Sequence, residues 1–81
     1  TMNIGKRSRY RVRLIHRNVP GVMARVNQIF ASYEANVDAQ ILATMDEVGY
    51  VLTDISAGLG REALEELSHL PETIRLIATP L

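Results

Sequence analysis

The chain has 81 residues with nine basic and nine acidic side chains, so its formal net charge is zero. This length allows one small domain, and because 47% of the residues are apolar, the composition excludes a disordered segment. Cysteine is absent, which excludes disulfides and thiolate metal sites, and no apolar run reaches the roughly 18 residues that a membrane span needs. We therefore expect a single cytoplasmic domain that does not enter a membrane.

Basic residues gather at the amino-terminal end of the sequence. Residues 1–25 carry no acidic side chain, whereas residues 26–81 carry all nine acids and only Arg61 and Arg75 as bases. Such asymmetry can mark a nucleic-acid patch, but the simpler interpretation is a basic arm joined to a strand with a solvated, arginine-bearing face. We assign residues 1–9 to a linker or arm and residues 10–81 to the folded domain.

The first two predicted elements are a strand and a helix. Tyr10–Ile15 alternates between apolar residues and arginines, which is typical of a half-buried strand. Pro20 suits the first turn of a helix, where its missing N–H is no loss. Apolar residues then recur every three or four positions from Val22 to Tyr33, which predicts an amphipathic helix, and residues 34–36 are expected to close it.

A hairpin is predicted next. Val37–Met45 is expected to form the second strand and Tyr50–Ile55 the third, because apolar and polar residues alternate in both. The residues between them, Asp46–Gly49, are typical of a turn in which Gly49 takes a positive φ.

The last third of the sequence predicts one helix and one strand. A loop over residues 57–60 precedes an amphipathic helix over Arg61–Leu70, which Pro71 ends. Ile74–Ala78 is the last predicted strand.

The predicted elements follow the order βαββαβ. This order predicts an α+β ferredoxin-like sandwich, in which a four-stranded antiparallel sheet carries two helices on one face. Right-handed crossovers give the spatial strand order 4-1-3-2, so the strand Val37–Met45 is an exposed edge. Because this edge has no proline or lysine to block pairing, we expect a homodimer formed through it.

The sequence carries no signature of catalysis or of a metal site. It lacks a dinucleotide-binding glycine pattern and a phosphate-binding loop, and its two histidines, His16 and His69, have no metal-ligand spacing. We therefore predict no catalytic residue, metal or cofactor in this chain. RNA-recognition modules share the βαββαβ order, but the third strand offers one aromatic residue and no basic one, so we do not expect a nucleic-acid partner.

The stretch IHRNVPG, residues 15–21, places polar side chains at a strand-to-helix corner. Free backbone N–H groups at Gly21 and Val22 suit a carboxylate, the Asn18 amide oxygen suits an ammonium group, and the His16 imidazole suits a hydroxyl. Together these groups suit a small zwitterion. The alternative is that Asn18 caps the helix and His16 merely ends a strand, and the residues alone favour it because asparagine is a leading N-cap residue.

The run IHRNVPGVMARVNQIFASYEANVDAQILAT, followed by GYVLTDI and LPETIRL, resembles an ACT domain. It is most similar to the serine-binding regulatory type found at the C-terminus of D-3-phosphoglycerate dehydrogenase. The most specific parts are His-x-Asn-x-Pro-Gly, a later Asn-Val-x-Ala-Gln and a terminal Leu-Pro-x-Thr-Ile-Arg. The resemblance covers about residues 10–78, and the arginines of the first strand are not part of its motif.

The resemblance implies that two such domains pair side by side into one continuous sheet and bind L-serine between them. On that basis His16 and Asn18 contact the effector from one copy, and Asn36 reaches it from the other. The implied role is allosteric feedback inhibition of a larger dehydrogenase, whose catalytic and NAD-binding domains lie upstream. Two alternatives stay open, namely a ligand-free assembly module and an ACT domain that senses another amino acid.

Overall fold

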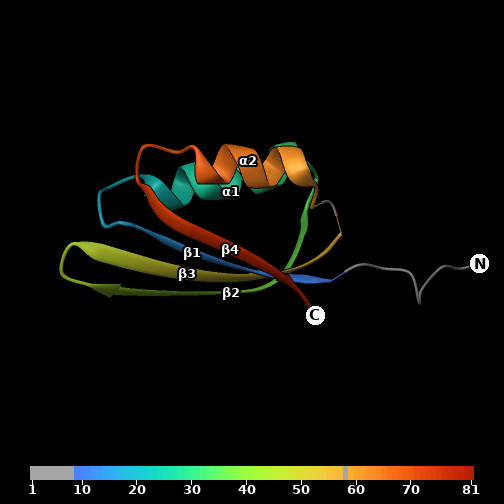
Figure 1. Ribbon diagram of the computed structural model, residues 1–81, viewed down its shortest axis with the longest axis horizontal. Helices are drawn as coiled ribbons and strands as arrows, with labels where there is room; N and C mark the ends of the chain where they lie inside the picture. The colour runs from blue at the N-terminus through green and yellow to red at the C-terminus, as the bar shows by residue number, and fades with distance from the viewer. Residues whose placement is uncertain (1–8, 58) are drawn as a thin grey trace, which may run out of the picture.

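The structure, a computed structural model, describes residues 9–57 and 59–81 (Figure 1). Its elements, in chain order, are β1 (Tyr10–Arg17), α1 (Val22–Ser32), β2 (Asn36–Met45), β3 (Val48–Ala57), α2 (Arg61–Ser68) and β4 (Thr73–Pro80). Most of the predicted arm, residues 1–8, and Gly58 of the predicted loop lie outside the described residues.

The four strands form one antiparallel sheet in the order β2-β3-β1-β4. Both helices cover the same face of this sheet, so the domain has two layers (Figure 1). The predicted α+β ferredoxin-like fold is therefore confirmed, with β1 and β3 central and β2 at an edge.

The hydrophobic core lies between the sheet and the helices because the two central strands alternate in sequence. Every second residue of β1 and β3 turns toward the apolar stripes of α1 and α2. The buried cluster consists of Val12, Leu14, Val22, Val26, Ile29, Phe30, Val51, Ile55 and Leu67. Burying each large apolar side chain contributes about 1.5–3 kcal/mol. The core therefore fixes the strand register, since a slip of one residue would turn the β1 arginines inward.

Two strand boundaries differ from the prediction, and as a result His16 and Asn36 both lie within strands. β1 continues to Arg17, so His16 lies inside the strand rather than at a loop corner. α1 ends at Ser32 and β2 begins at Asn36 rather than one residue later, so Asn36 belongs to the edge strand and does not close the helix. The connection between them turns through Glu34, whose φ is 57°.

The β2–β3 turn is tighter than predicted. Asp46 and Glu47 form it, and Asp46 takes the left-handed conformation with a φ of 54°. Gly49 lies within β3, where it pairs with His16 of β1, and its φ is not positive. The prediction that Gly49 serves the turn is therefore wrong.

The β1 arginines lie on the sheet face opposite the helices, as the alternating pattern predicts. Arg11 is held there by Asp54 of β3, to which its Nε and Nη2 donate at 2.7 Å and 2.9 Å. This paired hydrogen bond, together with the positive charge of Arg11, holds the pKa of the Asp54 carboxyl below its usual range. Arg9 approaches Asp38 at 3.9 Å, so the edge strand also takes part in neutralising the basic end of the chain.

The Arg11–Asp54 pair predicts how stability depends on acid. Because the pKa of Asp54 is lower in the folded state than in the unfolded chain, the pair stabilises the fold above the unfolded value of about 3.9, and this contribution is lost as the pH falls through the folded pKa. We expect Asp54→Asn to lower stability at neutral pH and to flatten the acid-side decline. Urea unfolding followed from about pH 6 to about pH 2 measures this, with Asp46→Asn in the exposed turn as the matched control. An unchanged acid limb in Asp54→Asn would contradict the account.

Candidate functional site

Three connections meet at one end of the sheet, and the predicted corner is among them. The β1–α1 loop, the β2–β3 turn and the α2–β4 loop all lie at this end (Figure 1). The backbone N–H of Arg17 donates to the carbonyl of Glu72 at 2.8 Å, and that of Asn18 donates to the carbonyl of Glu47 at 2.8 Å. The corner is therefore anchored to both neighbouring connections.

His16 lies under this corner with its imidazole buried. Its residue is 2% exposed, and Nδ1 lies 2.8 Å from the carbonyl oxygen of Arg17. A carbonyl only accepts hydrogen bonds, so Nδ1 carries the hydrogen, and in the neutral ring Nε2 is left as an acceptor. Nε2 is buried without a hydrogen-bond partner in the described part of the chain. Leaving a buried acceptor unpaired costs about 1–3 kcal/mol, so such atoms are normally completed by water or by a ligand.

Asn18 does not cap the helix. Its Nδ2 donates to the carbonyl of Asp46 at 3.0 Å, while the N-cap of α1 is Gly21, which has no side chain to accept from the helix N–H groups. The alternative favoured by the residues alone, a locally satisfied N-cap, is therefore wrong. Because the carbonyl of Asp46 only accepts, the orientation of the Asn18 amide is fixed, and Oδ1 is the atom left to accept a hydrogen bond.

The start of α1 offers backbone donors beside these side chains. The first hydrogen bond of the helix runs from the N–H of Arg25 to the carbonyl of Gly21 at 3.2 Å, so the N–H groups of the preceding turn, including that of Val22, have no partner within the helix. Gly21 has a φ of 87°, a conformation in which a residue with a Cβ is strained. The Pro-Gly pair therefore sets the direction in which these donors point.

Asn36 lies far from the other two candidates within one chain. It opens β2, whereas the turn that holds Asn18 follows the last residue of β2, and nine steps of about 3.3 Å separate the two ends of the strand. Its Nδ2 donates to Ser56 Oγ at 2.6 Å and to Asp38 Oδ1 at 3.0 Å. A carboxylate only accepts, so the amide is again oriented, and Oδ1 is the atom left free of these bonds.

His16, Asn18, Gly21 and Val22 thus lie within one short stretch between the end of β1 and the start of α1, and Asn36 lies at the other end of the edge strand. Sequence reasoning missed Gly49, which lies under the His16 ring, and Ser56, which orients Asn36. A glycine inside a strand pattern was the signal for the first, since it often marks a close approach. The role of Ser56 has no local signal because its partners come from another strand.

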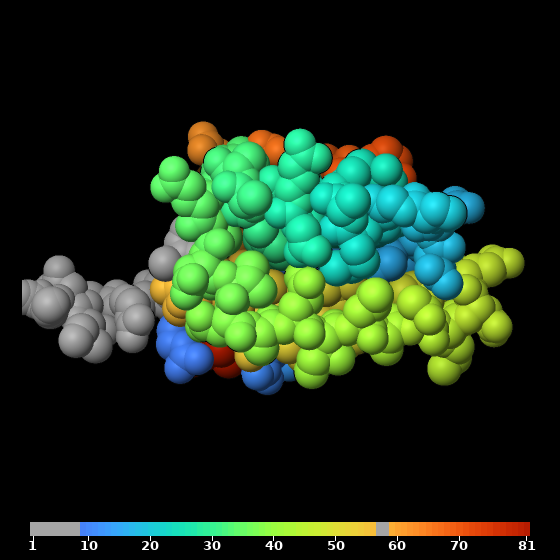
Figure 2. All heavy atoms as spheres, turned by 180° about the vertical axis from the view of Figure 1, so that it is seen from behind, coloured from blue at the N-terminus to red at the C-terminus, as the bar shows by residue number. Residues whose placement is uncertain are grey.

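The edge strand β2 is exposed along most of its length. Figure 2 shows its side chains along the outer side of the molecule below α1. Large apolar residues on it are open to solvent: Val37 is 40% exposed, Ile41 60%, Leu42 50% and Met45 77%. A strand edge of this kind, with exposed apolar side chains, is available for pairing with another chain.

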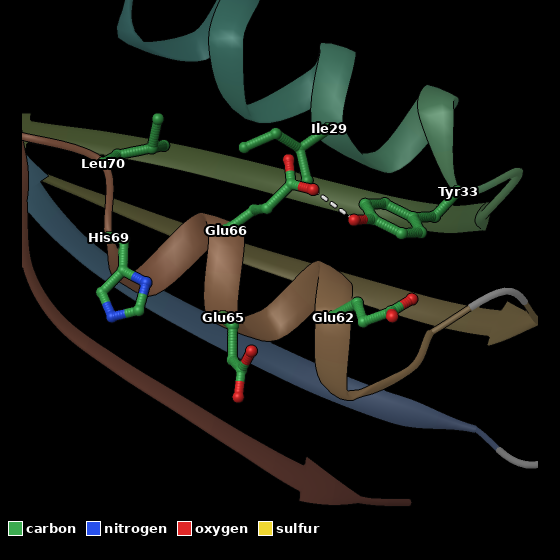
Figure 3. A pocket seen from close by; sticks show the side chains of 7 residues that line it. All are labelled: Ile29, Tyr33, Glu62, Glu65, Glu66, His69 and Leu70. Atoms are coloured by element: carbon green, nitrogen blue, oxygen red, sulfur yellow. Dashed lines mark hydrogen bonds between the residues drawn. The ribbon is translucent and has the colours of Figure 1, made fainter.

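A shallow groove of about 490 Å³ lies between the helices, where Ile29 and Tyr33 of α1 face α2 (Figure 3). The Tyr33 hydroxyl donates to the Glu66 carboxylate, which raises the pKa of Tyr33 to about 12, with burial and nearby carboxylates adding to the effect. Over residues 9–57 and 59–81 there is no group of three His, Asp or Glu side chains that could hold a metal ion. None of the helices in these ranges is long and apolar enough to cross a membrane.

The chain is thus a two-layer ferredoxin-like domain with an open edge strand and a polar corner after its first strand. The family profile described as the AHAS small subunit-like ACT domain matches residues 12–75, and this chain belongs to the ACT domain family. In fold it is similar to the ACT domain of a GTP pyrophosphokinase from Chlorobium tepidum, with a TM-score of 0.79 over 91% of this chain and 100% of that one at 9% identity.

Two relatives in sequence are D-3-phosphoglycerate dehydrogenases. The protein from Dictyostelium discoideum is 35% identical over 84% of this chain, and the one from Escherichia coli strain K12 is 43% identical over 75% of it. The chain spans 16% and 15% of the lengths of these two relatives. The resemblance to the ACT domains of this dehydrogenase family is therefore confirmed.

The Tyr33–Glu66 contact predicts a late phenol titration. Because the hydrogen bond to Glu66 stabilises the neutral phenol, the hydroxyl of Tyr33 should lose its proton near pH 12. We expect Tyr33→Phe to remove this step in an ultraviolet absorbance titration and Tyr50→Phe to keep it. If the step near pH 12 persists in Tyr33→Phe, the hydrogen bond between Tyr33 and Glu66 is not its cause.

Proposed function

We propose that this chain is a regulatory domain that binds L-serine between two copies of itself and thereby controls a larger D-3-phosphoglycerate dehydrogenase. The observation that carries the proposal is the set of oriented acceptors. His16 Nε2, Asn18 Oδ1 and Asn36 Oδ1 are each left to accept, because the other polar atom of each side chain already donates to a carbonyl or a carboxylate.

Such a set fits the donors of a hydroxy amino acid. An α-ammonium group has three N–H donors and suits two amide oxygens, and a side-chain hydroxyl donates one hydrogen bond and suits an imidazole nitrogen. The carboxylate suits the free N–H groups at Gly21 and Val22, where the helix dipole also favours negative charge. Alanine and glycine lack the hydroxyl, so each would leave the buried His16 Nε2 unpaired.

Within one chain, Asn36 and the corner that holds Asn18 lie at opposite ends of β2, and pairing with a second copy would bring them together. If two β2 strands pair antiparallel over most of their length, the residues near position 36 of one copy lie close to those near position 45 of the other, across a strand spacing of about 4.8 Å. Met45 directly precedes Asp46, whose carbonyl holds the Asn18 amide. Asn36 of the second copy would thus reach the corner formed by the first, and the exposed apolar side chains of β2 would be covered.

The proposed regulation is allosteric feedback on the dehydrogenase. Serine that bridges two copies favours the arrangement in which both halves of the site meet, and it shifts the equilibrium only by its differential affinity for that arrangement. A coupling of about 1–3 kcal/mol, a factor of roughly 5–150, suffices. We place the catalytic residues and the NAD site in the remaining length of a protein like the relatives, not in this domain.

Calorimetric titration tests the effector. We expect L-serine to bind with measurable heat and one site per chain, and glycine and alanine to bind at least about tenfold more weakly because neither pairs His16 Nε2. Equal affinities for serine and alanine would rule out serine as the effector. Tighter binding of another amino acid in a thermal-shift screen would identify a different effector for the same site.

The contribution from the second copy is tested by Asn36→Ala. Removal of one oriented acceptor for an ammonium group should weaken serine binding by about tenfold to a hundredfold and leave the fold intact, since Asn36 is exposed. Asn27→Ala on α1, also an exposed asparagine with one side-chain bond in the chain, is the matched control and should bind as the parent does. Normal serine binding by a dimeric Asn36→Ala variant would remove Asn36 from the site.

The exposed apolar side chains of β2 also favour a second candidate function, a ligand-free assembly module. Sedimentation with and without L-serine separates the two candidates. For a regulatory domain, L-serine should lower the dissociation constant of the dimer. For an assembly module, the dissociation constant should be the same with and without L-serine.

A further inference from the structure

We propose that Gly49 is a positioning residue for His16, and that it acts by leaving room for the imidazole ring. Gly49 lies in β3 directly opposite His16 of β1. A Cβ atom built on Gly49 would lie 2.3 Å from Cε1, 2.6 Å from Nε2 and 3.0 Å from Nδ1 of His16. Carbon contacts this short do not occur, so the ring occupies the space that any side chain at position 49 would need.

Backbone conformation does not explain this glycine. Its φ is not positive, and its neighbours on both sides continue the strand. Glycine is intrinsically unfavourable inside a strand, because it gains no packing and loses more chain entropy than other residues. By contrast, a Cβ on Gly60, which precedes α2, would meet nothing within 4 Å. The requirement at position 49 is therefore for space, and the His16 ring creates it.

The ring is held from two directions. The backbone of Gly49 lies against one part of the ring, and Nδ1 donates to the carbonyl of Arg17 at 2.8 Å. Since His16 is 2% exposed, a ring pushed off Gly49 has no open space beside it and must give up the bond to Arg17. The tautomer would then no longer be fixed, and Nε2 would no longer be presented as an acceptor.

The consequence for ligand binding rests on the proposed function. If His16 Nε2 accepts from the effector hydroxyl, Gly49 fixes the position of that acceptor without touching the effector. Gly49 then contributes to the preference for a hydroxy amino acid, because the preference depends on an acceptor held in one place.

Nitrogen NMR of the imidazole is the direct test. In the parent chain, long-range proton–nitrogen correlations should show His16 as the Nδ1–H tautomer. In Gly49→Ala, they should show a mixture of tautomers or the Nε2–H form, while Gly60→Ala keeps the parent pattern. An unchanged His16 signal in a folded Gly49→Ala variant would overturn the proposal.

A double-mutant cycle keeps the test decisive if Gly49→Ala folds poorly. The clash should lower the melting temperature of Gly49→Ala by about 4–8 °C or more, and His16→Ala should abolish most of that loss because the obstructing ring is gone. The same loss in both backgrounds would show that position 49 acts through something other than His16.

Serine titration then connects the position of the ring to binding. Gly49→Ala should weaken the affinity for L-serine by about tenfold or more, and Gly60→Ala should not change this affinity. If the parent chain binds no serine, the proposed effector fails, but the NMR pattern and the mutant cycle still decide whether Gly49 positions His16. Parent-like serine affinity in Gly49→Ala would overturn the link between the two.

Discussion

The candidate site depends on the pair of hydrogen bonds that join Asn18 to the β2–β3 turn. The backbone N–H of Asn18 donates to Glu47 and its side-chain Nδ2 donates to Asp46, at 2.8 Å and 3.0 Å. These bonds draw the loop after a central strand toward the end of the edge strand. The bond to Asp46 also uses Nδ2 of the Asn18 side chain as a donor, so Oδ1 is left as a hydrogen-bond acceptor.

In His16 and Asn36, as in Asn18, the hydrogen-bond donors of the side chain are already used within the chain. The backbone carbonyl of Arg17 accepts a hydrogen bond from Nδ1 of His16. The side chains of Asp38 and Ser56 accept hydrogen bonds from the Asn36 amide. Each partner lies within the chain, so the domain is set to accept hydrogen bonds before any ligand arrives. Preorganisation of this kind lowers the entropy cost of binding. It also makes the two halves of the site chemically similar, although they lie at opposite ends of β2.

The fold could be predicted from the sequence because alternation and helical periodicity are local signals that the core obeys. The site could be predicted only in part. Asn18 has the ordinary preference of a helix cap, but a carbonyl 28 residues further along the chain competes for its amide and wins. Gly49 lies next to a turn, where glycine is common, but a glycine is required there because the ring of His16, on another strand, leaves no room for a side chain. Local propensity fails at both positions because the deciding partner is distant in sequence.

The central claim is that one site is built from two chains, and subunit complementation tests it most directly. Asn18→Ala and Asn36→Ala chains are refolded separately and as an equal mixture, and the serine sites are counted by calorimetry. Neither variant alone has an intact site, but a mixed dimer has one site with both asparagines. About half of the dimers in the mixture are mixed, so we predict that about a quarter of the sites return at parent affinity. No recovery in a mixture shown to contain mixed dimers would contradict a site shared between copies.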